Sequence, residues 1–173
     1  MSTTELAHVR PLRRADLARL ADLRLWFLAE TARLEPRLRL SPEIRERLPH
    51  EGSIWLGQED RVVLVAEDAT GASPAGEDPP LVGYATGLVS VWPPLWKTQR
   101  VGEVGDVFVI PDRRRHGVGR ALMQGVIEAL SRRGVEVLRA PVPVRNDGTT
   151  ALLRSLSFEP VLRIAERPLN GGR

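Results

Sequence analysis

Two glycines at alternate positions, Gly117 and Gly119, stand in an arginine-rich stretch of the sequence. Glycine has no Cβ, so a ligand can approach the main chain at both positions. If a helix begins here, the N–H groups of its first turn lack intrahelical partners and lie at the positive end of the helix dipole. Such a turn suits a phosphate or pyrophosphate, and further positive charge comes from Arg113, Arg114, Arg115 and Arg120. The alternative is that the glycines only permit a tight turn and close helix packing.

The elements that must position these glycines are indicated on both sides. Residues 103–110 are rich in β-branched and aromatic side chains, which predicts a strand, and Pro111 ends it. The spacing argues against a P-loop, whose lysine is missing, and against a dinucleotide fingerprint, because Leu122 stands where the third glycine would be. A helix after the glycines is predicted by apolar residues at three- and four-residue spacing: Val118, Leu122, Met123, Val126, Ile127 and Leu130.

Two blocks of this sequence resemble the GCN5-related N-acetyltransferase (GNAT) superfamily. Arg114-x-x-Gly117-x-Gly119, after a strand and opening an amphipathic helix, is similar to the superfamily's acetyl-CoA signature, Gln/Arg-x-x-Gly-x-Gly/Ala. Further along, the spacing of the family's Asn…Ala…Tyr…Gly-Phe segment is matched by Asn146, Leu153, Leu156 and Phe158. Together the two blocks cover about residues 102–160.

The resemblance implies an α/β fold with a mixed, mostly antiparallel sheet of six or seven strands and helices on both faces. It implies one domain over residues 1–173, and a splay between the fourth and fifth strands, here 103–110 and 135–142, that admits the thioester arm. Acetyl-CoA is then the co-substrate, with no metal. The implied cofactor-binding residues are Val107, Phe108 and Val109 beside the pantetheine arm, Arg114, Arg115, His116, Gly117, Val118, Gly119 and Arg120 around the pyrophosphate, and Asn146 on the pantetheine.

The rest of the chain is interpreted by pattern alone. Asp16 is a candidate cap for a helix whose apolar stripe runs to Leu28, and Ser41-Pro42-Glu43 starts a second helix that reaches about Leu48. Two segments rich in glycine or proline, residues 68–80 and 92–97, are predicted to be connections. Further strands are predicted at residues 8–12, 53–57, 61–67, 81–91 and 158–166, and a further short helix at 149–156.

Composition narrows the function classes. With 173 residues, 42% hydrophobic and 27% charged, the chain is typical of a single globular domain, and we expect a cytoplasmic protein because no signal or membrane segment is evident. The absence of cysteine excludes disulfides and a thiol nucleophile, and three scattered histidines do not suggest a metal site. A net charge of +3 does not argue for nucleic acid.

Acyl transfer to an amine needs a group that removes the ammonium proton, and Glu103 is the candidate base. It lies eleven residues before Arg114, the spacing at which histone-type members of the superfamily carry their catalytic glutamate. The alternative for Glu103 is a strand-edge charge in water. Asp106 is three residues further on, so strand alternation predicts that it faces the other way. Glu30, Glu35 and a water chain are the other candidates for the base.

One departure from the family concerns the acid that protonates the leaving thiolate. Many members have a tyrosine where this chain has Leu153, the usual glycine before Phe158 is Ser157, and the one tyrosine, Tyr84, lies on a different predicted strand. Either Ser155, Ser157 or water serves as acid, or the thiolate leaves unassisted, or acyl-CoA is bound without transfer. The sequence therefore predicts an N-acetyltransferase acting on a small-molecule or peptide amine, with a non-catalytic acyl-CoA sensor as the alternative and a homodimer as an open possibility.

Overall fold

The computed structural model describes residues 7–69, 78–91, 97, 100–161 and 164. Its sheet has the order β1-β2-β3-β4-β5, antiparallel throughout except for the parallel pair β4 and β5. The strands are β1 (Ala7–Pro11), β2 (Arg61–Asp68), β3 (Leu81–Val91), β4 (Arg100–Val109) and β5 (Val137–Arg139). The helices are α1 (Leu17–Leu34), α2 (Ile44–Leu56), α3 (Val118–Ser131) and α4 (Asp147–Arg154), with single 3-10 turns η1 (Arg14–Asp16) and η2 (Pro111–Arg113).

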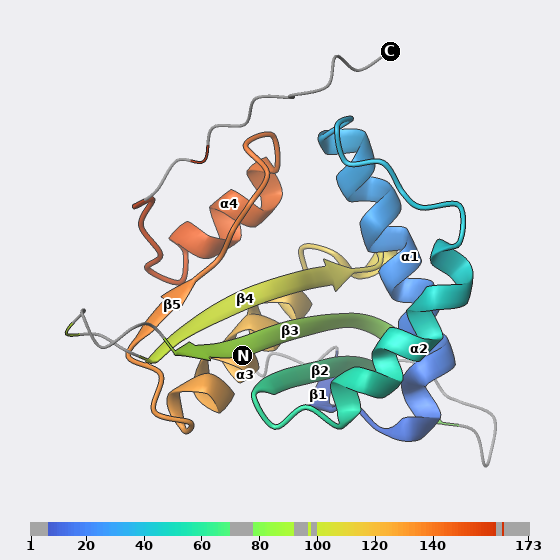
Figure 1. Cartoon of the computed structure of the whole chain (residues 1–173), viewed down its shortest axis with the longest axis horizontal. Coiled ribbons are helices and arrows are strands. Elements are labelled where there is room, and N and C mark those ends of the chain that lie inside the picture. Colours follow the sequence, from blue (N-terminus) through green and yellow to red (C-terminus); the bar gives the residue numbers. More distant parts are fainter. Residues whose placement is uncertain (1–6, 70–77, 92–96, 98–99, 162–163, 165–173) are drawn as a thin grey trace.

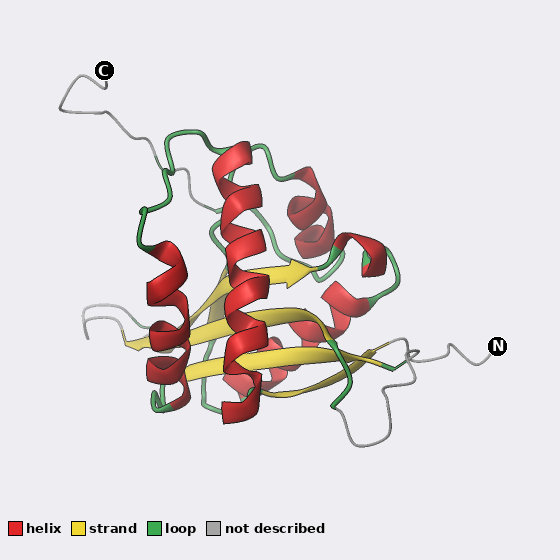
Figure 2. Cartoon of the chain, turned by 90° about the vertical axis from the view of Figure 1, so that its right-hand side faces the viewer, coloured by secondary structure: helices red, strands yellow, loops and turns green. Residues whose placement is uncertain are grey.

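Helices cover both faces of the sheet, as predicted. The α1 and α2 helices lie on one face and α3 lies behind the other (Figure 1). In Figure 2, which views the molecule from the side of α1 and α2, these helices cross in front of the strands. Behind the sheet, the apolar stripe of α3 packs on Val82, Ala85 and Val104; in front, Leu20 and Leu23 of α1 belong to a second cluster around Tyr84 and Phe108.

A β-bulge interrupts the pairing of β3 with β4. Ala85 pairs with Val107 but Gly87 pairs with Val104, so β4 places one extra residue opposite β3, at Gly105–Asp106. A bulge of this kind resets the alternation of side chains along its strand. Val104 and Val107 therefore both pack toward α3, although they are an odd number of residues apart.

The same bulge turns two carboxylates to one face, so the prediction that Asp106 faces away from Glu103 is wrong. Glu103 pairs with Leu88, and Asp106 accepts a hydrogen bond from Tyr84, 3.0 Å away. Tyr84 and Leu88 are four residues apart on β3, so their side chains leave the sheet on the same side, the α1 face. Simple period-2 reasoning fails here because the strand contains one residue too many.

The predicted splay between the fourth and fifth strands is confirmed. β5 pairs with β4 at three positions, the last of them Glu103 with Arg139. Beyond that pair β4 continues to Val109 while β5 leads away toward α4, so the two diverge (Figure 1). This opening exposes the edge of the second half of β4.

The predicted count of six or seven strands is wrong for the part of the chain that the structure describes, which has five. Residues 53–57 are not a strand: α2 continues through them to Leu56 because Leu48 and Gly52, one turn apart, both pack inward. A Cβ on Gly52 would lie 3.1 Å from Leu17, so the two helices approach closely there. The strand at 135–142 is limited to Val137–Arg139, residues 158–161 and 164 form no strand, and the rest of 158–166, like 92–96, lies outside the described residues.

Candidate active site

A cleft of about 830 Å³ is lined by residues of α1, the end of β4, the start of α3 and α4. Figure 1 shows α1 and α4 on either side of the end of β4. The floor of the cleft is the end of β4 and one end wall is the turn that leads into α3. The lining residues are Phe27, Glu30, Thr31, Arg33 and Leu34 of α1, Val107, Phe108 and Val109 of β4, Arg114, Arg115, Gly117, Gly119 and Arg120 of the turn and α3, and Asn146, Gly148, Thr149, Ala151, Leu152 and Ser155 around α4.

The turn before α3 has a backbone that favours glycine. Gly117 is the N-cap of α3 with φ of 85°, in the left-handed region, and Arg115 has φ of 65°. A Cβ on Gly117 would meet no atom within 4 Å, so the position is open in front as well as left-handed. The carbonyl of Gly117 accepts the N–H of Ala121, and the preceding amides of the first turn have no intrahelical acceptor. These amides and the helix dipole fit an anionic group such as a pyrophosphate.

The arginines between residues 113 and 120 make different contacts. The Arg114 guanidinium donates to the carbonyl of Val109 at 2.7 Å and to both carboxylate oxygens of Glu30 at 2.9 and 2.8 Å. It therefore joins the end of β4 to α1 across the cleft. Arg113 is paired with the buried Asp68 at 2.7 Å. Arg115 and Arg120 line the cleft as Arg114 does, and they lie next to the amides at the start of α3.

Most, but not all, of the predicted cofactor residues come together at the cleft. His116 is exposed and is not part of the lining, and the side chain of Val118 is buried in the core behind the sheet. Asn146 lines the cleft and also caps α4, because its Oδ1 accepts the N–H of Thr149 at 3.0 Å. The nine that meet there are Val107, Phe108, Val109, Arg114, Arg115, Gly117, Gly119, Arg120 and Asn146.

The candidate base, Glu103, is exposed and stands at the last paired position before the splay. Two of the alternatives are engaged elsewhere. Glu30 accepts the bidentate contact from Arg114. The hydrogen bond from Arg37 lowers the pKa of Glu35 to about 2, so this carboxylate is a weak base.

Asp106 is the carboxylate that strand alternation assigned to the wrong face; it lies on the same face as Glu103. Its Oδ2 accepts from the Tyr84 hydroxyl and lies 3.6 Å from Nε of Arg24, and its own N–H donates to Thr86. Burial raises the pKa of Asp106, and the charge of Arg24 opposes that rise. Burial, and then the charge of Asp106, raises the pKa of Tyr84, which keeps its hydroxyl protonated. Gly105 was the available signal, because glycine inside a strand often marks a bulge.

The segment that carries the family's tyrosine holds no replacement phenol. Leu153 is 9% exposed and belongs to the core behind the sheet. Ser155 lines the cleft, and its hydroxyl donates to the carbonyl of Leu152 at 2.6 Å. Ser157, where the family has glycine, has φ of 64° and does not line the cleft.

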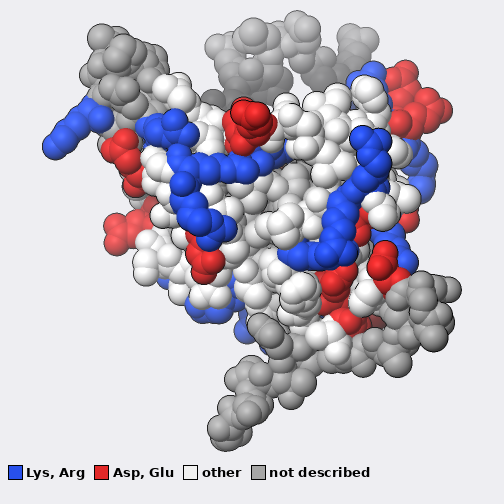
Figure 3. All heavy atoms as spheres, turned by 90° about the horizontal axis from the view of Figure 1, so that it is seen from below, with Lys and Arg blue, Asp and Glu red and all other residues white. Residues whose placement is uncertain are grey.

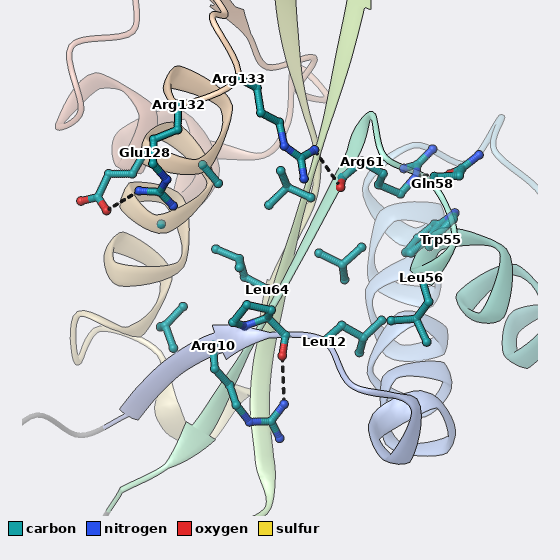
Figure 4. Close-up of a pocket in the computed structure, with 16 residues that line it drawn as sticks. Arg10, Leu12, Trp55, Leu56, Gln58, Arg61, Leu64, Glu128, Arg132 and Arg133 are labelled. Atoms are coloured by element: carbon teal, nitrogen blue, oxygen red, sulfur yellow. Dashed lines mark hydrogen bonds and ion pairs between the residues drawn. The ribbon is translucent and has the colours of Figure 1, made fainter.

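A second hollow, of about 600 Å³, lies at the opposite edge of the sheet (Figure 4). It is bordered by β1, β2, the end of α2 and the back of α3. Its arginines already have protein partners: Arg133 donates to the carbonyl of Arg61 at 2.9 Å, and Arg132 lies 3.8 Å from Glu128. The face seen in Figure 3 carries separate groups of basic side chains with acidic ones beside them. We assign no ligand to this hollow.

A split sheet, a cleft along its free strand and an amide-rich helix start define an architecture suited to a CoA thioester. The chain belongs to the acetyltransferase (GNAT) family, whose model matches residues 22–158. This family uses acetyl-CoA. The chain is 39% identical over 69 residues to the ribosomal protein bS18-alanine N-acetyltransferase of Escherichia coli K12, a match that covers 39% of this chain. The chain spans about half the length of that relative, 47%.

Solved structures with the same fold support the assignment of the architecture. A Bacillus halodurans protein, BH1408, has a TM-score of 0.80 at 20% identity, covering 94% of this chain and 99% of its own. A predicted acetyltransferase of Clostridium acetobutylicum with acetyl-CoA has a TM-score of 0.73 at 15% identity, covering 94% and 96%. The aminoglycoside acetyltransferase AAC(6')-Iy with a bisubstrate analogue has a TM-score of 0.69 at 16% identity, covering 95% and 98%.

The described residues contain neither a membrane-spanning helix nor a cluster of metal ligands. No helix among them has the length and apolar character needed to cross a membrane. Within the same residues, no group of three or more histidine, aspartate or glutamate side chains is arranged to hold a metal ion.

Proposed function

We propose that this protein is an acetyl-CoA-dependent N-acetyltransferase that moves the acetyl group to a primary amine by direct attack in a ternary complex. The observation that carries the proposal is the cleft that combines the free edge of β4 with the unpaired amides at the start of α3. An extended arm can pair with a free strand edge, and a pyrophosphate suits a helix N-terminus. One cleft thus offers both parts of CoA a matching surface.

The cleft residues divide by the part of acetyl-CoA that each would hold. Main-chain groups of Val107 and Val109 would pair with the pantetheine arm, and the Asn146 side chain would bond to it. The amides at the start of α3, with Arg115 and Arg120 beside them, would hold the pyrophosphate. Arg114 would act indirectly, because its contacts with Val109 and Glu30 fix the walls of the cleft.

Glu103 is the proposed general base. It stands where β4 and β5 part, so a thioester seated in the splay would end close to it. The amine nitrogen bonds to the carbonyl carbon, the carbon–sulfur bond breaks, and Glu103 takes the proton that the amine loses. The departing thiolate gains a proton from Ser155 or from water. General acid catalysis is typically worth about 10²–10⁴-fold, so the loss of the tyrosine slows the reaction without forbidding it.

The acceptor is a primary amine on a small molecule or a peptide. The E. coli relative is a ribosomal protein bS18-alanine N-acetyltransferase, and AAC(6')-Iy was solved with the bisubstrate analogue CoA-S-monomethyl-acetylneamine. Both acceptors are cationic amines. We therefore take an alanine-first hexapeptide and neamine as the two test acceptors.

The test is calorimetric binding of acetyl-CoA followed, in the same sample, by measurement of thiol release with each acceptor. Binding with release is the expected result. Binding without release on either acceptor would favour a non-catalytic acyl-CoA sensor, the function that Leu153 at the tyrosine position favours. If acetyl-CoA does not bind, the assignment of the cleft is wrong.

A further inference from the structure

We propose that Asp106 is the acceptor-binding carboxylate of this protein and that it holds the ammonium or amino group of the acceptor beside Glu103. This inference deepens the proposed function and rests on it. It places the acceptor on the α1 face of the sheet, opposite the face that α3 covers. Three features support it: the bulge, the shared cationic partner of Asp106 and the hydrogen-bonding capacity that Asp106 retains.

The bulge creates the juxtaposition. In a regular strand Glu103 and Asp106 would leave opposite faces, but the extra residue at Gly105 turns both to the α1 face. Glu103 and Gly105 are exposed there, so α1 and α2 leave this part of the face open. An acceptor lying on it would meet both carboxylates, while the thioester arm approaches through the splay next to Glu103.

Asp106 shares its cationic partner with another carboxylate. Arg24 of α1 lies 3.6 Å from Asp106 through its Nε and also pairs with Glu51 of α2 at 3.0 Å. One guanidinium is therefore shared by two carboxylates, and Glu103, whose partner on β5 is Arg139, adds a third carboxylate on the same face. The other groups near Asp106 are the neutral Tyr84 hydroxyl of β3 and the more distant Arg61 of β2. A cationic amine is attracted to a carboxylate that has only a share of one guanidinium.

Asp106 retains the capacity to bind such a group. Tyr84 donates to Oδ2, and among the described residues no hydrogen bond reaches the other oxygen, Oδ1. The side chain is 22% exposed, whereas Arg24 is 7% exposed. Among the described residues, Nε of Arg24 is buried without a hydrogen-bond partner, and its ion-pair contact is with Oδ2 at 3.6 Å, not with Oδ1. A purely structural aspartate would be expected to be closed off on both oxygens.

The test compares Asp106→Asn with the wild type in steady-state assays on the alanine-first hexapeptide and on neamine. Asparagine still accepts a hydrogen bond from Tyr84, so we expect the melting temperature to change little. We expect KM for the amine to rise about 10- to 100-fold, the usual loss for a hydrogen bond to a charged group, with a smaller change in kcat. The calorimetric Kd for acetyl-CoA should stay the same, and Asp106→Glu should recover part of the lost affinity.

Two controls separate a binding role from a structural one. Tyr84→Phe removes the hydroxyl partner of Asp106 but leaves the charge of Asp106 in place. It should therefore lower the melting temperature while KM for the amine changes much less than in Asp106→Asn. Asp112→Asn removes an exposed carboxylate of η2 and should change neither. An unchanged KM for Asp106→Asn, with an active wild type, would overturn the inference alone. A wild type that transfers acetyl to neither acceptor would overturn the proposed function and this inference with it.

Discussion

The two sides of β4 are built by different means. On the proposed cofactor side, the groups that we assign to acetyl-CoA are mainly main chain: the free strand edge at Val107–Val109 and the amides that follow Gly117. On the proposed acceptor side, the groups that we assign to the acceptor are the side chains of Glu103 and Asp106, and the contacts of Asp106 come from α1 and β3. Main-chain geometry tolerates many side chains, whereas a side-chain site changes with a single substitution. A common CoA site can therefore be combined with different acceptors.

Glu103→Gln is expected to have the largest effect, because it changes a side chain of the acceptor side and leaves the main chain of the cofactor side intact. Removing a general base typically costs about 10²–10⁴-fold, so we expect kcat to fall by about 100-fold or more. The Kd for acetyl-CoA should not change, because the cofactor side depends on main chain. Calorimetry and thiol-release kinetics measure the two quantities.

Glu59→Gln is the matched control for that change, because Glu59 is exposed in the turn before β2 and should alter neither quantity. Full activity of Glu103→Gln would remove this residue from the mechanism. The amine would then have to react in its neutral form or lose its proton to a water chain. The proposed acceptor side would in that case contain no catalytic residue.

Asp16→Asn should lower the stability of the whole domain, on which both sides of β4 depend. Asp16 immediately precedes α1, and its carboxylate receives two hydrogen bonds from buried Arg10 at 2.7 and 2.9 Å. Breaking a buried ion pair by changing one partner costs about 3 kcal/mol, so we expect a loss of that size in the free energy of unfolding. Urea unfolding measures it. A loss below 1 kcal/mol would show that Arg10 is sufficiently paired by Glu67.

The same pair predicts a dependence of stability on pH. Burial raises the pKa of Asp16, but the hydrogen bonds from Arg10 and from the Arg13 N–H outweigh it, so the folded-state pKa lies below the ordinary value. The contribution of Asp16 is therefore fully present above the unfolded pKa of about 4 and is lost as pH falls through the folded value. Asp16→Asn should be less sensitive to acid than the wild type. Equal sensitivity would contradict the assigned shift.

Gly117→Ala tests the cofactor side through its backbone. The left-handed φ of 85° costs a residue with a Cβ about 1–2 kcal/mol, although no neighbour obstructs the Cβ itself. We expect that loss in unfolding free energy, together with weaker acetyl-CoA binding, because the turn would shift to relieve the strain. Gly119→Ala is the control for stability: its Cβ would make ordinary contacts of 3.6 and 3.7 Å, and it should not be destabilised.

The cofactor side could be predicted from the sequence because its geometry is local. A left-handed residue before a helix requires glycine, and the apolar period of α3 follows directly. The proposed acceptor side required the register of β4 against β3: Gly105 signals a bulge in the sequence, but the pairing that follows it is set by contacts between the two strands. Residues 53–57 show the same limit: Ile54, Trp55 and Leu56 fit a short strand as well as a helix, and packing of α2 on α1 decides between them.

Ser157→Gly is expected to have the smallest effect on the free energy of unfolding, and to raise it where the other variants lower it. Ser157 has φ of 64°, and relief of that strain, less the extra entropy of glycine in the unfolded chain, leaves a gain of about 0.5 kcal/mol. Thermal unfolding measures it. Ser131→Gly, at the right-handed end of α3, should instead lose about as much.

The same variant distinguishes the two serines as acids. Ser157 does not line the cleft whereas Ser155 does, so kcat for Ser157→Gly should equal that of the wild type. A fall of tenfold or more would make the Ser157 hydroxyl the proton donor to the thiolate. It would also mean that the strained backbone at Ser157 is maintained for catalysis. The segment after α4 would then be a third functional region, beside the two sides of β4, and its chemistry would depend on a side chain.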